Sequence, residues 1–256
     1  MEHRITRPVP ALSAAAAALA LVVAGAWAWQ AASTSTEVSV ATAVGEFRDT
    51  GVADVATGDA PAPGVYSYAA SGSETAHIGP ISIDRDVPAQ ARYIVTATPE
   101  GFQAELRISG EHTEAVRYAV GSHWIRATWR RVDVTFLRIG RDDRRPLTPA
   151  VPAIPVRPRV GQTWNVAYSA WKLRTTGTAT VVRRETVTVA GAPVTAFLIE
   201  TRTRTSGAHG GPRTERMWWS PRLGVPVRLE TDTTLEGPVG YRSRVRLDLT
   251  SPAPAR

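Results

Sequence analysis

Ser169 and Lys172 are the first candidates for catalytic residues, because they match a Ser-x-x-Lys pattern. In penicillin-binding enzymes that pattern works because the lysine lies one helical turn from the serine and deprotonates it. Here the pair falls in a predicted strand, where residues three apart face opposite sides. The companion Ser-Asp-Asn and Lys-Thr-Gly motifs are missing, as are a Gly-x-Ser-x-Gly elbow and a glycine-rich phosphate loop. We therefore expect no catalytic residue, no cofactor and no enzymatic activity.

The histidines show no metal-ligand spacing. Glu111, His112 and Glu114 form the densest group of potential ligands, but a metal site needs further ligands from other strands, and the chain has 0 cysteines. We interpret the group as turn residues and predict no metal site. The remaining internal histidines are scattered singly along the chain: His77, His123 and His209.

Large aromatic side chains are the more informative candidates. Two tyrosines share one face of a predicted strand, and tryptophans recur on several later strands. They either fill a packed core or border an apolar pocket on the concave face of a sheet. The pocket hypothesis names five ligand-binding residues: Tyr66, Tyr68, Trp124, Trp164 and Trp171.

The elements that position these residues are predicted to be β-strands. After Gly64, β-branched and aromatic residues alternate with Arg, Thr and Glu, and Gly or Pro recurs about every ten residues. No amphipathic helix is apparent in this region. Short connections favour a meander, so we expect a mainly β fold, either one large curved antiparallel sheet or an incomplete barrel of the half-barrel type.

The last two predicted strands have a readable register. Setting Leu235 opposite Tyr241 places Leu229 opposite Leu247 on one face. On the other face the same register creates three pairs of opposite charge. Side chains that lie directly opposite each other on neighbouring strands contribute to sheet stability. These pairs are Arg228 with Asp248, Glu230 with Arg246, and Asp232 with Arg244.

Every third residue from Pro146 to Pro158 is proline. Polyproline II has three residues per turn, so this spacing places the prolines on one stripe of an extended segment. A docking ligand for a partner is one interpretation. The preferred one is a stiff crossover between two parts of the sheet.

The N-terminal region carries a membrane signal. Residues 11–29 contain no charge and no proline, and follow Arg4 and Arg7. As a helix this run would rise about 28 Å, close to the hydrocarbon thickness of a bilayer. Basic residues stay on the cytoplasmic side, which predicts that residues 1–10 are cytoplasmic and the bulk of the chain extracytoplasmic. The alternative is a cleaved signal at Ala24-Gly-Ala26 or Ala26-Trp-Ala28 and a secreted protein.

The rest of the chain divides by composition. Residues 30–63 are poor in apolar side chains and are predicted to be a flexible linker, with a short helix around Thr42 to Phe47 as the alternative. Residues 64–250 form the predicted β domain and residues 251–256 a disordered tail. The net charge of +7 favours anionic envelope partners, although a single lysine among 30 basic residues suggests a compositional origin.

Several local motifs resemble uncharacterised cell-envelope proteins of actinobacteria. They are Gly64-Val-Tyr-Ser-Tyr68 with Gly72 and Glu74, Gly161-Gln-Thr-Trp164, Val187 to Val194, and Trp219-Ser-Pro…Gly-Val-Pro-Val-Arg228. In order and turn chemistry the chain is also distantly similar to lipoprotein-carrier half-barrel domains. The resemblance implies a half-barrel from about residue 64 to 250 and assigns no catalytic residue.

Together these observations predict a membrane-tethered, extracytoplasmic and non-enzymatic module. It would bind an apolar or lipid-like ligand or an envelope partner, and no nucleic acid. The alternative from another class is a purely structural or assembly protein without a ligand site, and an enzyme ranks third.

Overall fold

The fold was analysed in a computed structural model, which describes residues 33–50, 60–136, 139–170, 172–207, 210–237 and 239–256. The predicted cytoplasmic residues 1–10 and the predicted transmembrane or signal segment 11–29 lie outside these ranges. Among the described residues, no helix has both the length and the apolar character needed to cross a membrane.

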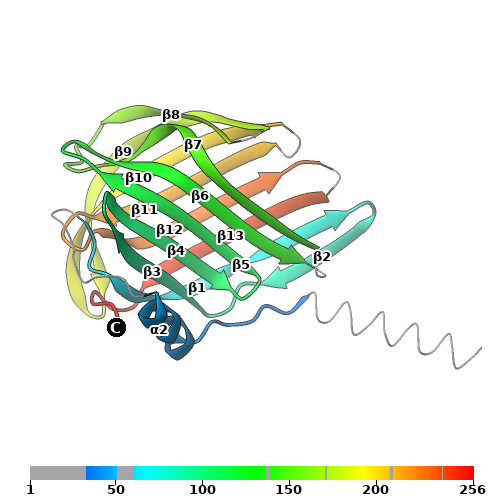
Figure 1. The fold of residues 1–256 in the computed structure, drawn as a ribbon, viewed down its shortest axis with the longest axis horizontal. Coiled ribbons are helices and arrows are strands. Elements are labelled where there is room, and N and C mark those ends of the chain that lie inside the picture. The colour runs from blue at the N-terminus through cyan, green and yellow to red at the C-terminus, as the bar shows by residue number, and fades with distance from the viewer. Residues whose placement is uncertain (1–32, 51–59, 137–138, 171, 208–209, 238) are drawn as a thin grey trace, which may run out of the picture.

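The described part of the chain is almost entirely antiparallel β-sheet (Figure 1). One short helix, α2, precedes the strands. The elements are α2 (Val40–Asp49), β1 (Gly64–Ile78), β2 (Ile81–Asp86), β3 (Gln90–Thr98), β4 (Gly101–Ser109), β5 (His112–Val120), β6 (Trp124–Phe136), β7 (Ile139–Pro155), β8 (Thr163–Ala170), β9 (Leu173–Val189), β10 (Ala192–Ser206), β11 (Gly211–Ser220), β12 (Val225–Leu235) and β13 (Val239–Leu249).

The sheet closes on itself, which corrects one part of the predicted fold. Each strand from β3 to β13 pairs with its sequence neighbour, and β13 then pairs with β1 from Tyr68↔Leu249 to Ile78↔Val239. The opposite edge of β1 is shared, because its first half pairs with β3 and its second half with the short strand β2. The mainly β, antiparallel prediction is confirmed. The incomplete barrel is wrong, since twelve strands form a closed ring.

Closure depends on a glycine where β1 meets β13. Gly72 has φ +133°, outside the usual range of L-residues, and faces Val245 in the register. A Cβ atom built on Gly72 would lie 1.9 Å from the carbonyl oxygen of Arg244. Only glycine permits the two backbones to approach so closely at this position.

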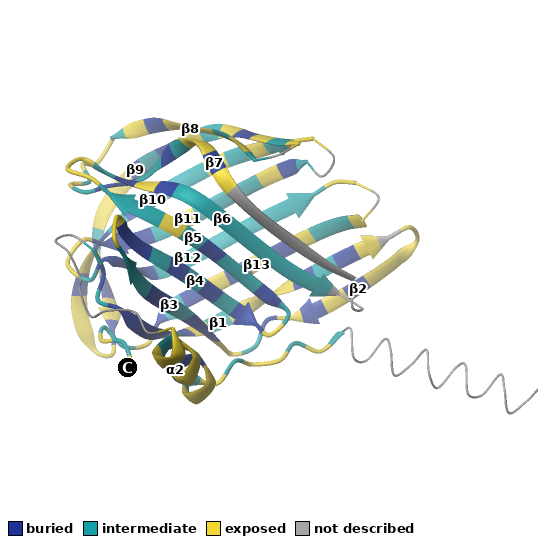
Figure 2. Cartoon of the chain, in the orientation of Figure 1, coloured by how far each residue is buried: buried dark blue, intermediate teal, exposed yellow. Residues whose placement is uncertain are grey.

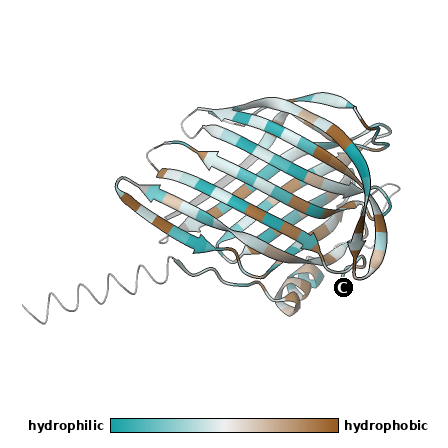
Figure 3. Cartoon of the chain, turned by 180° about the vertical axis from the view of Figure 1, so that it is seen from behind, coloured by the Kyte–Doolittle hydropathy of each residue, from teal (hydrophilic) through white to brown (hydrophobic). Residues whose placement is uncertain are grey.

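The predicted register of the last hairpin is confirmed. Leu229 pairs with Leu247 between β12 and β13, and Leu247 is fully buried. The three predicted charge pairs lie opposite one another on the outer face, at N···O distances of 2.5 Å for Arg228–Asp248, 3.4 Å for Arg246–Glu230 and 3.0 Å for Arg244–Asp232. Figure 3 shows the corresponding alternation of hydrophilic and hydrophobic residues along the strands.

The proline-rich segment is a strand, not a crossover. Pro146 and Pro155 lie within β7 and pair with residues of β6. Between the pairs Trp129↔Pro146 and Ala127↔Val151, β7 has four residues and β6 only one, so β7 bulges where prolines cannot donate ladder hydrogen bonds. A proline-rich sequence is therefore accommodated by a bulge instead of an excursion out of the sheet.

The two ends of the barrel differ in their packing. The packed end carries the turns at residues 99–100, 190–191 and 221–224, and the polar end carries those at 79–80, 110–111 and 236–237. Inward-facing side chains near the packed end form one continuous apolar core that includes Tyr66, Phe102, Val181 and Trp219. Toward the polar end burial decreases, and Figure 2 shows β6 as half-buried along most of its length.

The segment before β1 is partly ordered against the outside of the barrel, in contrast to the predicted flexible linker. Ser39 caps α2 by accepting a hydrogen bond from the Thr42 backbone N–H at 3.0 Å, and Ala43 of α2 packs on Val65 and Ile94. This helix agrees with the alternative prediction around Thr42 to Phe47, because its apolar face covers the outer surface of β1 and β3.

The C-terminal residues also differ from the predicted disordered tail. Ala255 and Val65 exchange two backbone hydrogen bonds of 2.9 Å in an isolated antiparallel bridge. Thr250 donates its backbone N–H to the carbonyl oxygen of Ser67 at 3.0 Å. The tail is thus held along β1, which composition alone did not indicate.

Candidate functional site in the barrel interior

The interior changes from apolar to charged along the barrel axis. On β5, Tyr118 and Val116 precede Glu114 and His112 in the direction of the polar end, and all four face inward by strand alternation. On β11, directly across the barrel, Met217 is likewise followed by Glu215 and Arg213. A band of apolar side chains therefore lies between the packed core and a layer of ionised groups.

A group of three residues, which we call the charged crossbar, spans this layer: Glu114, Arg130 and Arg213. The Glu114 carboxylate accepts a hydrogen bond from Arg130 Nη2 at 2.7 Å, and two from Arg213 at 3.0 and 3.3 Å. Arg213 also contacts Glu215 on its own strand at 3.1 Å. The two arginines therefore face two carboxylates, Glu114 and Glu215.

The crossbar joins opposite walls of the ring. It connects β5 with β11, six places apart in a closed order of twelve strands. A circular barrel of that size would be about 24 Å across for strands 4.8 Å apart at the usual tilt. That width exceeds the combined reach of a glutamate and an arginine side chain, so the cross-section is flattened where the crossbar lies.

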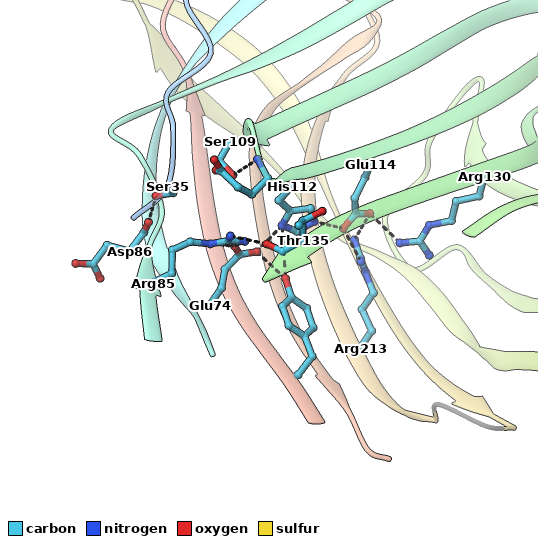
Figure 4. A network of polar contacts seen from close by, with 12 residues as sticks. Ser35, Glu74, Arg85, Asp86, Ser109, His112, Glu114, Arg130, Thr135 and Arg213 are labelled. Carbon is cyan, nitrogen blue, oxygen red and sulfur yellow. Dashed lines mark hydrogen bonds and ion pairs between the residues drawn. The ribbon is translucent and has the colours of Figure 1, made fainter. Parts of the chain in front are cut away.

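A second set of side chains, the Glu74 cluster, adjoins the crossbar through His112 (Figure 4). Its members are Glu74, Arg85, His112 and Tyr241. Glu74 accepts hydrogen bonds from Arg85 Nε at 3.0 Å and from the Tyr241 hydroxyl at 2.6 Å, and it also contacts His112 Nδ1. His112 Nε2 lies 3.5 Å from a carboxylate oxygen of Glu114, which links the cluster to the crossbar.

These contacts determine the ionisation of the cluster. Burial alone would lower the pKa of His112, but its contacts with Glu114 and Glu74 raise that pKa to about 9. Burial alone would raise the pKa of Glu74, but hydrogen bonding and charge from His112, together with Arg85 and Tyr241, lower that pKa to about 2. At neutral pH, His112 is therefore a cation between two carboxylates and cannot serve as a general base.

Solvent reaches the crossbar but not the Glu74 cluster. Side-chain exposure is 26% for Arg130 and 15% for Glu114, compared with 3% for His112 and 2% for Glu74. The inward-facing residues around the crossbar are half-buried although they lie inside a closed ring. This set includes Val116, Tyr118, Thr201, Thr203, Met217, Leu229 and Thr231. The interior around the crossbar is therefore incompletely filled by side chains.

The structure places the two predicted ligand-binding tyrosines in the packed core. The hydroxyl of Tyr66 donates to the Ala62 carbonyl at 3.0 Å, and that of Tyr68 to the Pro226 carbonyl at 2.5 Å. Both tyrosines are fully buried. Their predicted role in ligand binding stays a prediction, and the interior opening described above lies farther toward the polar end.

Two of the predicted tryptophans meet each other at the packed end. Trp124 and Trp164 pack edge to face with ring centroids 5.1 Å apart, and Trp164 Nε1 donates to the Pro152 carbonyl at 2.9 Å. Trp171 lies outside the described residues. The structure thus places Trp124 and Trp164 in contact with each other, in the same apolar core as the two tyrosines of β1.

The groups first considered for catalysis or metal binding take other positions. Ser169 lies in β8 opposite Arg174, whereas Lys172 lies beyond the end of that strand. Glu111 accepts a hydrogen bond from the backbone N–H of Thr36 at 2.9 Å. Within the described ranges, no three His, Asp or Glu side chains are grouped so that they could hold a metal ion.

Sequence reasoning missed the interior polar residues for identifiable reasons. Alternation along β5 does put His112 and Glu114 on the same face as the apolar Val116 and Tyr118, and an ionisable residue on an apolar face was the available signal. Arg130 gave no such signal, because a bulge at Thr128 reverses the alternation within β6.

The outer surface has a separate shallow groove of about 270 Å³ over β1 and β11 to β13. Its charged residues include Arg216, Glu230, Asp232, Arg244 and Arg246. Each of these side chains contacts an opposite charge across or along the strands. The groove therefore presents paired charges, and it is a weaker candidate for a site than the interior.

Comparisons with known proteins identify no family. No family model matches the chain, and no curated protein sequence matches it. Among solved structures, the hypothetical lipoprotein YmcC from Escherichia coli K12 is similar at 11% sequence identity and a TM-score of 0.34, over 74% of this chain and 86% of that one. The resemblance to actinobacterial envelope proteins remains a prediction from local motifs.

Proposed function

We propose that this protein is a non-enzymatic binding module that holds a small amphipathic, lipid-like ligand inside its barrel. One observation carries the proposal. The inward-facing residues of the apolar band and of the charged layer next to it are only half-buried, although they lie inside the barrel. In this arrangement the apolar part of the ligand contacts Val116, Met217 and Leu229. Its polar part meets the charged crossbar.

The size of the ring supports this arrangement. Side chains just fill the interior of barrels of about eight strands, and larger barrels enclose cavities or channels. Twelve strands surround this interior, flattened at the crossbar. Space for one ligand beside the crossbar is consistent with the exposure of the surrounding threonines.

The crossbar also offers a donor for the polar part of the ligand. Arg130 Nε is buried and has no hydrogen-bond partner among the described residues, while Arg130 Nη2 holds Glu114. An N–H without a partner in such a place costs free energy unless a water molecule or a ligand accepts from it. A carboxylate or phosphate head group would accept a hydrogen bond from that N–H.

The proposed place of action is the outer side of the cytoplasmic membrane, with residues 11–29 retained as the anchor. This rests on the apolar run and the two arginines before it. An amphipathic ligand of the kind proposed would be available at that surface.

A structural module without a ligand is the second candidate. It is favoured by the bridging of opposite walls, since Glu114 is already saturated by Arg130 and Arg213. In that case the crossbar serves to brace a flattened barrel, and water alone occupies the interior.

Photocrosslinking separates the two candidates. The full chain, reconstituted in phospholipid vesicles, is irradiated with a fatty acid that carries a diazirine in its acyl chain, and the modified peptides are identified by mass spectrometry. Binding in the interior predicts cross-links to inward-facing residues of β5, β11 and β12. Met217→Trp fills the apolar band and should reduce these cross-links at least tenfold.

The neighbouring residue provides a matched control. Arg216 precedes Met217 on β11, faces outward and is 49% exposed, so Arg216→Trp should leave interior labelling unchanged. Leu229→Trp serves as a second filling variant should Met217→Trp fail to fold. Labelling confined to residues 11–29 and the outer face, or interior labelling unaffected by filling, would reject the proposal and favour the structural role.

A further inference from the structure

The segment before α2 runs along the barrel toward its polar end (Figure 1). The Ser35 hydroxyl donates to the Asp86 carbonyl, and Thr36 accepts from the Gly110 backbone N–H at 2.8 Å. Thr36 also donates its own N–H to the Glu111 carboxylate at 2.9 Å, in the turn between β4 and β5. Residues 35–36 are thus attached to the polar end by three hydrogen bonds.

The chain that leads to this segment is short. The apolar run predicted to span the membrane ends at Trp29, four residues before Ser33, the first described residue. Four extended residues reach at most about 14 Å. An anchor of this length holds the end of the barrel where the segment is attached close to the bilayer surface.

Exposed aliphatic side chains occur at the same end. Ile81 is 50% exposed and Val239 is 40% exposed. Each of them pairs with Ile78 at the tip of β1. They flank Ile78 in the register, one on each side of β1, at the β1–β2 and β12–β13 turns. Apolar side chains gathered on the exposed tips of neighbouring strands can form a contact with a membrane.

Basic residues accompany them. At the polar end four basic side chains are exposed, against three exposed carboxylates, those of Asp84, Asp86 and Glu236, and Arg204 lies 3.9 Å from Glu236. Basic side chains near a membrane surface favour contact with anionic lipid. The basic residues are Lys172, Arg174, Arg204 and Arg242.

We propose that the polar end of the barrel rests on the outer surface of an anionic lipid bilayer, with Ile81 and Val239 inserted at the level of the head groups. The short tether, the aliphatic tips and the basic rim all lie at this end, so this end of the barrel faces the membrane. The proposal depends on the predicted anchor and is independent of whether the interior binds a ligand.

The chain is well suited to a test by site-specific labelling because it contains 0 cysteines. Three single variants, Ile81→Cys, Val239→Cys and Val160→Cys, are labelled with the fluorophore NBD in the full-length protein. Val160 is 59% exposed and lies in the loop between β7 and β8 at the packed end, so it is a matched aliphatic control. The proteins are reconstituted in vesicles of phosphatidylcholine and phosphatidylglycerol that contain a lipid with a nitroxide on its head group.

We expect nitroxide quenching to be at least threefold stronger at positions 81 and 239 than at position 160, with blue-shifted NBD emission at the first two. Replacing phosphatidylglycerol by phosphatidylcholine should reduce the difference, since the basic rim then loses its partner. Equal quenching at the three positions, or stronger quenching at 160, would overturn the proposed orientation. Recovery of a shortened chain that does not associate with the vesicles would overturn it as well.

Discussion

Replacing Glu114 by glutamine tests whether the crossbar braces the barrel. The substitution keeps the shape of the side chain and removes the charge that both Arg130 and Arg213 contact, leaving two arginines and the His112 cation facing one another. Loss of one partner of a fully buried ion pair costs about 3 to 5 kcal/mol, and of an exposed pair about 0 to 1 kcal/mol. Glu114 is 15% exposed, so we expect a loss of about 2 to 3 kcal/mol.

The assay is urea unfolding at neutral pH, followed by tryptophan fluorescence and analysed by linear extrapolation. Asp232→Asn is the matched control, because Asp232 contacts Arg244 at 3.0 Å on the outer face, where the two side chains are 45% and 60% exposed. That control should lose no more than about 0.5 kcal/mol. If Glu114→Gln and Asp232→Asn had equal effects, or if the double variant Glu114→Gln/Arg213→Gln showed no coupling, the crossbar would not brace the barrel.

Four further perturbations address closure, ionisation and the packed end. Gly72→Ala should lower the free energy of unfolding in urea by about 3 kcal/mol or more, because its Cβ would meet the Arg244 carbonyl. Gly79→Ala is the control: Gly79 is also at positive φ but has open space around it, so the loss should be only about 1 kcal/mol. Equal losses would contradict the close approach of the two backbones at Gly72. The pKa of His112 is raised from 6.5 to about 9, so the stability that its charge contributes is complete below pH 6.5 and is lost as pH rises through 9. The thermal unfolding midpoint should therefore fall across that window. His112→Gln should flatten this dependence of the midpoint on pH. The lowered pKa of Glu74 acts at the other extreme, with stability lost as pH falls from 4.5 toward 2, and Glu74→Gln should remove that loss. Trp164→Phe should lose about 1 kcal/mol through the hydrogen bond to the Pro152 carbonyl, and an unchanged midpoint would show that this bond contributes nothing.

Local pairing was readable from the sequence where two strands adjoin and no bulge intervenes. The β12–β13 hairpin is such a case, since Leu229 and Leu247 had to share a face and the charges then fell opposite one another. Closure was not readable, because the pairing of β1 with β13 joins segments about 170 residues apart and involves no turn. Composition likewise gave no indication that Ala255 would pair with Val65.

The interior site depends on features that cancel simple alternation. Thr128 adds a residue to β6 relative to β5, so Trp129 faces outward beside Arg117 while Arg130 turns inward toward Glu114. Without that bulge, the regular alternation of inward and outward residues along β6 would place Arg130 on the outer surface, where an arginine is ordinary. Arg213 then reaches the same carboxylate from the opposite wall, a contact that exists only after the ring has closed and flattened. The candidate site is therefore a property of the closed barrel, and strand-by-strand reading could identify Glu114 as an anomaly but not its partners.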